Sequence, residues 1–429
     1  MILLAHLAHI GDCHVFVASF YHFHYSCTTT DGQRVAIVQS HFSLTKVAKL
    51  NSQTTVVHIA SGDLWAGAEV QLYYLARELH NDKGINLFVI LLNHGILENK
   101  LRGLGIDITV LDERKLSSLQ IFLRIFSYLK KNRPSIVHTH RQKENVLGSI
   151  ATLFYGKAKS LRTVHGSSES QLGLLQLYKR FFRFIDWICG RLIQDAIVAV
   201  SAPLAEELAQ QFSAKIICIV ENGIDIDELK NKAKESINLP GPAAVIRVAI
   251  VGRLVPVKRI DIFLDIARAL NEQQPGRYAF YILGDGPLLT MINNKIEQLG
   301  LNHVVFMLGF LPNVAAYLSK MDILLITSDH EGLPMNLLEA LTLSVPVVAH
   351  AVGGIPQVLH YGDFGTLVYD QNIKQYVSAI EGYAKNPRLM LEKTEAAHEI
   401  IKKSYSSKIC AQRYSSIYAS LSKDKQRRN

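Results

Sequence analysis

Short apolar runs alternate with longer amphipathic segments in two successive series along the chain, and this pattern limits the folds open to it. The first series predicts β-strands at 56–60, 87–92, 106–111, 136–140, 161–164, 196–200 and 216–220. The second predicts strands at 245–251, 278–283, 304–308, 323–327, 345–349 and 366–369. Helices are predicted between them, for example at 69–79, 119–131, 260–270, 288–299 and 335–343. Continuous Val/Ile/Leu runs are typical of strands buried on both faces, and their alternation with helices indicates mostly parallel sheets.

Residues 225–244 separate the two series. This stretch is lysine-rich and polar and ends in Pro240-Gly241-Pro242, so it is interpreted as a linker. A chain of 429 residues is also too long for one ordinary core. The sequence therefore predicts an α/β protein with two facing Rossmann-like, doubly wound parallel-sheet domains, at 53–224 and 245–406. Ligands of such sheets bind beyond the carboxyl ends of the strands, so we expect a cleft between the domains.

The two ends of the chain do not continue the alternation. Residues 1–52 are interpreted as an extension of uncertain order, and their start lacks the basic residues and the cleavage site of a signal peptide. At the other end a helix is predicted from Ser407 to Leu421, followed by a basic tail that completes the segment 407–429.

Composition excludes several classes of protein. Hydrophobic residues make up 48% and charged residues 19%, which is a globular balance. The five cysteines are scattered without a C-x-x-C pair, which argues against a disulfide framework or a cysteine zinc site and favours a reducing compartment. The net charge of +9 suits anionic partners, but the chain has no helix-turn-helix, zinc or aromatic RNA-binding motif, so nucleic-acid binding is not predicted.

The strongest functional motif is Glu-Gly-Leu-Pro-Met-Asn-Leu-Leu-Glu at 331–339. Pro334 suits the first turn of a helix, because its missing N–H has no partner there anyway. The amino end of that helix offers free N–H groups to a phosphate. Glu331, in the loop, can accept hydrogen bonds from sugar hydroxyls, and Glu339, in the helix, from ribose hydroxyls. The alternative is a pair of ordinary helix-stabilising and solvated carboxylates.

A second motif, Gly252-Arg253-Leu254 followed by Lys258, comes directly after the first strand of the second series. Arginine offers a planar fork and lysine a point charge, and both complement phosphate oxygens. With both present, no metal is needed to neutralise a departing diphosphate. A plain surface pair of basic residues is the alternative.

Weaker signals occupy corresponding positions at strand ends. Gly284 and Gly286 follow one strand of the second series, and Gly67 with Glu69 opens a helix after the first strand of the chain. His165 ends another strand, where a catalytic side chain would face the cleft, although a lone histidine is more often structural. His138 and His140 share one strand face, but they lack acidic or cysteine partners at ligand spacing, so no metal site is predicted.

Together these segments resemble the large retaining glycosyltransferase family four, whose members have the two-domain GT-B fold. The resemblance covers about residues 54–418. It rests on the order and spacing of Gly-Arg-Leu with its lysine, Gly-Asp-Gly-Pro (284–287), the Glu-x7-Glu motif, Val-Pro-Val-Val-Ala (345–349) and Val-Gly-Gly-Ile-Pro (352–356). The sequence departs from the family at Ala66 and Arg259, where glycine is frequent, and both changes bear on donor preference.

The resemblance implies transfer of a sugar from a nucleotide-diphosphate-sugar, with retention at the anomeric carbon and with neither metal nor cofactor. UDP is the commonest donor nucleotide in the family, so a UDP-sugar is expected. The implied donor-binding residues of the second domain are Arg253, Lys258, Gly284, Gly286, Glu331, Gly332, Leu333 and Glu339. The implied catalytic residues are His165, Glu331, Arg253 and Lys258. The first domain would bind the acceptor, with Gly67, Glu69 and His165 lining the cleft, and the last helix would pack back onto this domain.

The stretch at 172–193 reads LGLLQLYKRFFRFIDWICGRLI and mixes aromatic with basic residues. A basic amphipathic helix of this kind can lie on an anionic membrane, which suits a cytoplasmic enzyme at the inner face of a membrane and a lipid-linked acceptor in surface polysaccharide assembly. A core helix with snorkelling basic side chains is the alternative.

Other activities share the expected fold, so the fold alone does not fix the function. A nucleotide-sugar epimerase would consume donor without an acceptor, and a phosphorylase of the common type would hold pyridoxal phosphate on a lysine. A non-catalytic protein would bind the sugar nucleotide without transfer. The combination of Arg253, Lys258, Glu331 and Glu339 argues against the non-catalytic protein.

Overall fold

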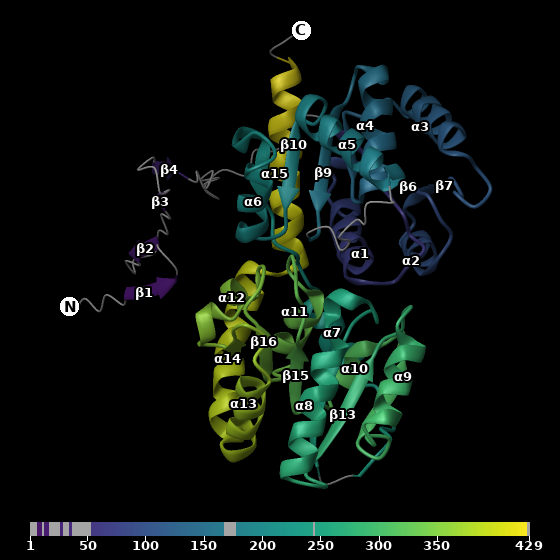
Figure 1. The fold of residues 1–429 in the computed structure, drawn as a ribbon. Coiled ribbons are helices and arrows are strands. Elements are labelled where there is room, and N and C mark those ends of the chain that lie inside the picture. Colours follow the sequence, from purple (N-terminus) through teal and green to yellow (C-terminus); the bar gives the residue numbers. More distant parts are fainter. Residues whose placement is uncertain are drawn as a thin grey trace. The chain divides into compact units, whose positions relative to one another are not determined.

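The computed structural model describes residues 53–166, 177–242 and 245–426, together with four short strands near the amino terminus (Figure 1). Those strands belong to a separate compact unit, Met1–Ala48. In it β1 (Leu7–Ile10) pairs antiparallel with β2 (Cys13–Phe16), and β3 (Ser26–Thr28) with β4 (Arg34–Ala36). The remainder, Lys49–Asn429, forms the second unit, which contains two α/β lobes.

The first lobe is built on a seven-stranded parallel sheet with the order β11-β10-β9-β8-β5-β6-β7. Its strands are β5 (Thr54–Ala60), β6 (Ile85–Leu91), β7 (Asp107–Val110), β8 (Ile136–Thr139), β9 (Lys159–Val164), β10 (Ala196–Ala199) and β11 (Ile217–Ile219). Its helices are α1 (Gly67–His80), α2 (Ile96–Gly103), α3 (Ser118–Asn132), α4 (Gln142–Tyr155), α5 (Leu177–Leu192) and α6 (Ala202–Ala209).

Alternate residues of β5 supply two apolar layers, one on each face of this sheet. Val57 and Ile59 pack with α3 and α4. Val56 and Ala60 pack in the layer that holds α1 and the last helix of the chain, α15 (Ser407–Gln426). Figure 1 shows α15, in yellow, running along the first lobe, far in sequence from the other helices there.

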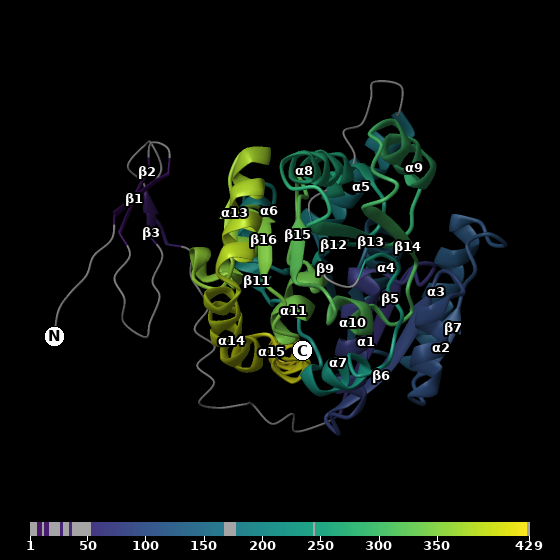
Figure 2. The same ribbon diagram turned by 90° about the horizontal axis from the view of Figure 1, so that it is seen from below.

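The second lobe is built on a six-stranded parallel sheet with the order β14-β13-β12-β15-β16-β17. Its strands are β12 (Ile246–Val251), β13 (Tyr278–Leu283), β14 (Val305–Gly309), β15 (Ile323–Ile326), β16 (Val347–His350) and β17 (Thr366–Val368). Its helices are α8 (Ile260–Gln273), α9 (Leu289–Gln298), α10 (Val314–Leu318), α11 (Met335–Thr342), α12 (Ile355–Val358), α13 (Ile373–Lys385) and α14 (Pro387–Ser404). Helices α8 and α13 cover one face and α11 and α14 the other (Figure 2).

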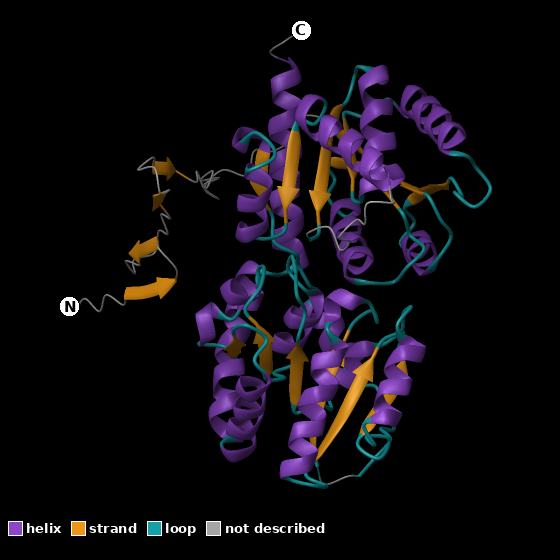
Figure 3. Cartoon of the chain, in the orientation of Figure 1, coloured by secondary structure: helices purple, strands orange, loops and turns teal. Residues whose placement is uncertain are grey.

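Both lobes therefore have the predicted doubly wound α/β architecture, and every predicted strand is present, with ends that differ by at most two residues. Each sheet grows outward in both directions from its first strand, so the strand order reverses between β5 and β8 and between β12 and β15. Ligands of such sheets bind where the order reverses, at the carboxyl ends of the strands. In both lobes the arrowheads of the strands point toward the junction between the lobes (Figure 3).

The segment interpreted from the sequence as a linker contains a helix, α7 (Ile226–Lys232). Asp225 caps it by accepting a hydrogen bond from the Glu228 amide at 2.8 Å. Arg77 of α1 forms ion pairs with both of these carboxylates, while α7 packs against α10 and α11. Helix α7 is therefore attached to both lobes.

Candidate functional site

The loop after β12 carries the predicted phosphate-binding cations. Lys258 ends a short 3-10 helix, Pro256–Lys258, and its Nζ lies 2.6 Å from Oε1 of Glu331. Arg253 is half-buried, and none of the described carboxylates pairs with its guanidinium. The structure thus brings one predicted cation onto a predicted carboxylate and leaves the other cation available to a ligand.

The loop after β15 carries the motif that contains Glu331. Pro334 occupies the N-cap position of α11, so the backbone amides of the first turn are free of main-chain partners on that side. Gly332 accepts a hydrogen bond from the Gly354 amide at 2.7 Å through its carbonyl oxygen. The neighbouring Leu333 is buried, and its carbonyl oxygen accepts from Nδ2 of Asn222 at 2.7 Å. Side chains and backbone from three loops therefore fix this turn.

Glu339 lies in α11, as predicted, and is partly buried. Burial raises the pKa of its carboxyl group to about 7, an effect that the charge of Lys232 partly offsets. Its side chain forms no hydrogen bond or ion pair with any described residue. An unpartnered carboxyl with a raised pKa at the end of a strand–loop–helix unit is a candidate for ligand binding.

Gly284 and Gly286 allow the loops after β12 and β13 to approach each other. Gly284 has a φ of +149°, and a Cβ there would stand 1.9 Å from the carbonyl oxygen of Gly252. A Cβ on Gly286 would stand 2.7 Å from backbone atoms of Leu254. These two glycines therefore shape the loop that holds Arg253 through a contact between loops.

The first lobe places Gly67 and Glu69 at the start of α1. A Cβ on Gly67 would meet a carbon of Met335 of α11 at 3.6 Å, so Gly67 faces the second lobe. Glu69 is buried, accepts a hydrogen bond from the Ala66 amide at 3.2 Å and pairs with Arg141. Both of its oxygens are thus engaged within the first lobe, where burial raises the pKa of the carboxyl.

His165 follows β9 and meets the second lobe through its backbone. A Cβ on Gly332 would stand 2.1 Å from the carbonyl oxygen of His165, so these two residues are in close contact. Nε2 of His165 lies 3.3 Å from Nδ1 of His140, whereas Nδ1 of His165 is buried and has no partner. Burial lowers the pKa of His165 to about 4, so the imidazole is neutral at physiological pH.

Three functional features were not predicted from the sequence. His58, His138 and His140 form a buried group in which one ring nitrogen from each residue lies within 4.8 Å of the other two. Asn222 and Asn336 each donate to a backbone carbonyl, Leu333 and Val251 respectively, at 2.7 Å. Asn222 comes three residues after β11. Its position beyond the carboxyl end of a strand is the sequence feature that could have marked it as a candidate site residue.

Arg259, a departure from the family pattern, has a φ of +49°, a conformation that glycine adopts without cost. Its guanidinium pairs with Asp261 and Asp329 and donates to Gln371 at 2.6 Å. These contacts compensate for the backbone strain and occupy the side chain within the second lobe.

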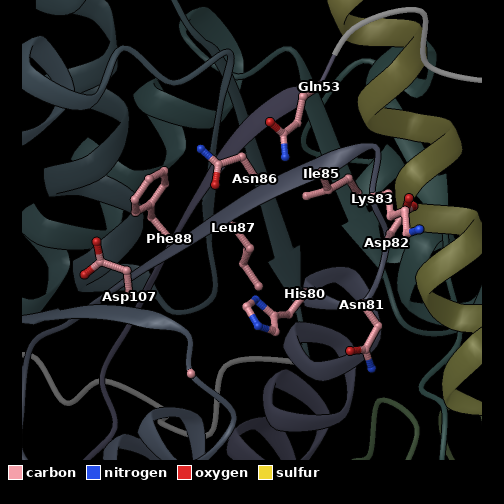
Figure 4. Close-up of a pocket in the computed structure, with 11 residues that line it drawn as sticks. Gln53, His80, Asn81, Asp82, Lys83, Ile85, Asn86, Leu87, Phe88 and Asp107 are labelled. Carbon is pink, nitrogen blue, oxygen red and sulfur yellow. The ribbon is translucent and has the colours of Figure 1, made fainter.

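A pocket of about 300 Å³ lies at the opposite end of the first sheet, at the amino ends of β5, β6 and β7 (Figure 4). Gln53, Asn86 and Asp107 are among the residues that line it. None of the predicted site residues lines this pocket, so it is separate from the candidate site.

Models of two glycosyltransferase families match adjoining parts of the chain. The one described as Glycosyltransferase Family 4 matches residues 65–228, and the one described as Glycosyl transferases group 1 matches residues 230–406. The boundary between the matches falls within α7.

Individual relatives share about a quarter of their aligned residues with this chain. UDP-Gal:alpha-D-GlcNAc-diphosphoundecaprenol alpha-1,3-galactosyltransferase of Escherichia coli is 25% identical over 281 residues, which cover 62% of this chain and 70% of the relative. The amylovoran biosynthesis glycosyltransferase AmsK of Erwinia amylovora is 26% identical over 264 residues, which cover 59% of this chain and 58% of the relative.

Solved structures confirm the fold. Anabaena Alr3699/HepE, crystallised with UDP and glucose, has a TM-score of 0.72 at 19% identity, with 86% of this chain and all of that chain covered. Staphylococcus aureus TarM has a TM-score of 0.66 at 14% identity, with 85% and 98% covered. The two lobes, the order of the motifs and the adjoining family matches agree: this chain belongs to the group 1/family 4 glycosyltransferases with the GT-B fold.

Proposed function

We propose that this chain transfers a hexose from a UDP-sugar to a hydroxyl group of a lipid-linked glycan during assembly of a surface polysaccharide, with retention of configuration and without a metal. The observation that carries the proposal is the meeting of Lys258 and Glu331 at the point where the second sheet reverses its strand order, next to the loop of Arg253. This is where the fold binds its ligands.

In the proposed reaction the acceptor oxygen bonds to the anomeric carbon as the bond from that carbon to the diphosphate oxygen breaks. The acceptor's proton passes to the departing diphosphate, on the same face of the sugar. Arg253, Lys258 and the first turn of α11 stabilise the negative charge that develops on the diphosphate. Glu339 holds the ribose hydroxyls, and Glu331 and His165 contact the sugar.

Support for a lipid-linked acceptor comes from the named relatives. The Escherichia coli relative acts, by its name, on a sugar carried on diphosphoundecaprenol, and the Erwinia relative takes part in amylovoran biosynthesis. Both names describe glycan assembly, so we propose the same class of pathway for this chain.

The membrane contact of the proposal rests on α5. Its side chains Phe181 and Phe184 are 60% and 55% exposed, and Arg180 and Arg191 are exposed on the same helix. Exposed aromatic and basic side chains together suit the interface of an anionic membrane. Among the described helices, none combines the length and apolarity required to cross a bilayer. The proposed location is the cytoplasm, at the inner face of a membrane.

The decisive experiment is a thermal-shift screen of the full chain with UDP-, GDP-, ADP- and dTDP-sugars, each with and without EDTA. Stabilisation by UDP-sugars that EDTA does not change supports the proposed donor site. No stabilisation by any of the four would contradict it. Donor consumption that needs no acceptor and yields an epimer would instead identify a nucleotide-sugar epimerase, and binding without turnover a non-catalytic protein.

A further inference from the structure

A continuous chain of hydrogen bonds runs through the core of the first lobe to His165. At its inner end, the hydroxyl of Tyr414 on α15 lies 2.7 Å from Oγ1 of Thr163, which lies 2.8 Å from Nε2 of His138. Nδ1 of His138 lies 2.7 Å from the hydroxyl of Tyr418, one turn farther along α15. Two tyrosines from the end of the sequence are thus joined to β8 and β9.

The chain continues through three more imidazoles. The hydroxyl of Tyr418 lies 3.1 Å from Nε2 of His58, and Nδ1 of His58 lies 2.9 Å from Nε2 of His140. Nδ1 of His140 then lies 3.3 Å from Nε2 of His165. Every ring nitrogen in the chain has a partner except Nδ1 of His165, which is buried without one.

The four imidazoles that take part in this chain of hydrogen bonds are all neutral. Burial lowers the pKa of His58 to about 3 and that of His165 to about 4, and it holds the pKa of His138 and His140 well below the ordinary range. A neutral imidazole carries one proton, so it donates through one nitrogen and accepts through the other. Each hydroxyl likewise carries one proton.

Counting these protons limits the directions in which the hydrogen bonds can run. The chain holds seven groups, with one proton each, joined by six hydrogen bonds that take one proton each. One proton is therefore left over, and it points either out of one end or out of an interior hydroxyl that accepts both of its bonds; Thr163 and Tyr418 have no further acceptor among the described residues, so an outward proton on either would be unsatisfied in the core. At the inner end it would leave Tyr414, which is 2% exposed and packed among apolar residues with no second hydrogen-bond partner among those described. At the outer end it would sit on Nδ1 of His165, a buried atom without a partner in a residue whose backbone contacts Gly332 of the second lobe.

An unsatisfied donor in an apolar core is costly, whereas a donor at a ligand site is satisfied when the ligand arrives. We propose that His58, His138, His140 and Tyr418 form a one-way hydrogen-bond chain that sets the tautomer of His165, so that its Nδ1–H is presented to an oxygen of the donor sugar. Tyr418 is then a positioning residue, and α15 is coupled to the site in the first lobe. This inference rests on the proposed donor site.

The same histidines could be considered for a metal, but the contacts favour hydrogen bonding. The 2.9 Å separation of Nδ1 of His58 and Nε2 of His140 is an ordinary hydrogen-bond distance. Two imidazoles bound to one zinc would hold their nitrogens about 3.3 Å apart, given Zn–N distances of about 2.0–2.1 Å and tetrahedral angles. The other nitrogens of the group are occupied by the hydroxyl groups of Thr163 and Tyr418 and, at His140, by the imidazole of His165.

The direct test is the tautomer of His165 in the full-length protein labelled with ¹⁵N-histidine. Two-bond ¹⁵N–¹H correlation spectra at pH 7.5, recorded with UDP-glucose bound, distinguish Nδ1–H from Nε2–H, and comparison with His165→Gln assigns the signal. We expect Nδ1–H in the wild type. An Nε2–H signal from the wild type overturns the inference without any variant, and so does zinc bound at one equivalent in the purified protein.

Tyr418→Phe tests the transmission along the chain. The variant cuts the chain between His138 and His58, so the remaining outward proton can sit on His58 or on His165. We expect the Nδ1–H population of His165 to fall below that of the wild type, because the proton gains a second possible position on His58. Tyr383→Phe is the matched control, because this buried tyrosine donates to the Val347 carbonyl at 3.1 Å in the second lobe. It should leave the tautomer unchanged.

Kinetics provide the second measurement and separate the two proposals. Release of UDP from UDP-glucose should show a kcat at least about twofold lower in Tyr418→Phe than in Tyr383→Phe. The Kd for UDP should be unchanged, because the nucleotide contacts are intact. If the wild type neither binds UDP nor releases it from UDP-glucose, the proposed function fails. If it does both but Tyr418→Phe has the tautomer and kcat of the control, the hydrogen-bond chain alone fails.

Discussion

Lys258 and Glu331 form an ion pair, with 2.6 Å between Nζ and Oε1, although 73 positions separate them in the sequence. Their side chains are only 20% and 11% exposed, so screening by solvent is limited. In the absence of a donor each neutralises the other. A bound diphosphate would compete with Glu331 for the ammonium group, and we expect this exchange to free the carboxylate for the sugar.

Replacing Lys258 by alanine should reduce both donor binding and stability. The variant leaves the carboxylate of Glu331 unpaired in a mostly buried position, at a cost of about 1–3 kcal/mol in the free energy of unfolding. It also removes a charge from the proposed diphosphate site, so affinity for a UDP-sugar should fall at least about tenfold. Denaturant unfolding and calorimetry measure the two effects.

Two variants separate these effects. The double variant Lys258→Met/Glu331→Gln removes both charges, so it should recover most of the stability and none of the affinity. Arg253→Ala breaks no ion pair among the described residues, so it should weaken binding and leave unfolding within about 0.5 kcal/mol of the wild type. Normal UDP-sugar binding by Lys258→Ala would overturn the assignment of the donor site.

The carboxyl of Glu339 should make nucleotide binding depend on pH. Its pKa of about 7 means that it loses its proton between pH 6 and pH 8, and only the carboxylate accepts strongly from ribose hydroxyls through both oxygens. The Kd for UDP should therefore weaken about three- to tenfold between pH 8 and pH 6. Glu339→Gln should bind weakly at both, and an equal pH dependence in this variant would contradict the assigned role.

The raised pKa of Glu339 also makes the free energy of unfolding depend on pH. In the unfolded chain Glu339 ionises near its ordinary pKa, below that of the folded state, so the folded state binds more protons between about pH 4.5 and pH 7. Stability should therefore fall as pH rises through this window. The wild type should lose stability relative to Glu339→Gln from pH 5 to pH 7.5, measured as the difference in unfolding free energy. Buried Glu144, with a pKa near 7 as well, is present in both proteins and cancels.

The fold was predictable because its strands are buried on both faces. Runs such as 323–326 and 278–283 are apolar throughout and bounded by polar turns, so their existence and type follow from local sequence. Helix α7 was not recognised, because its charged residues give no apolar periodicity. Asp225 caps the helix, and both Asp225 and Glu228 pair with Arg77.

The candidate site was predictable only in part, because its contacts join segments that are far apart in the sequence. Motifs fixed which strand ends carry Arg253, Lys258 and Glu331, but the ion pair between the last two depends on how β12 and β15 adjoin. The histidine chain depends on contacts at still longer range. His138 and His140 share a strand face, yet their partners His58 and Tyr418 lie 360 positions apart, and no local pattern joins them.

The aromatic side chains of α5 should mediate binding to anionic vesicles. Phe181→Asp/Phe184→Asp replaces two exposed side chains, so the fold should be unaffected, while partitioning onto phosphatidylglycerol vesicles should fall at least about tenfold. Met291→Asp, on α9, is the matched control because Met291 is 58% exposed. Equal sedimentation of both variants with the vesicles would remove α5 from the membrane contact.

The contact between His165 and Gly332 should be sensitive to a single methyl group. In Gly332→Ala the added carbon would stand 2.1 Å from the His165 carbonyl oxygen and 2.8 Å from Val200, so the loop after β15 must move away from the first lobe. We expect a loss of about 1–3 kcal/mol in the free energy of unfolding and at least a tenfold loss of kcat for UDP-sugar turnover.

Gly166→Ala is the matched control for this contact, because its added carbon would meet the Gly332 amide nitrogen at 3.6 Å, an ordinary van der Waals distance. This variant should keep stability and turnover close to those of the wild type. The two glycines lie on opposite sides of the same contact, so a difference between the variants isolates the cost of forcing His165 and the loop of Glu331 apart. If Gly332→Ala instead turns over UDP-sugar as fast as Gly166→Ala, close approach of these two segments is not required for the reaction.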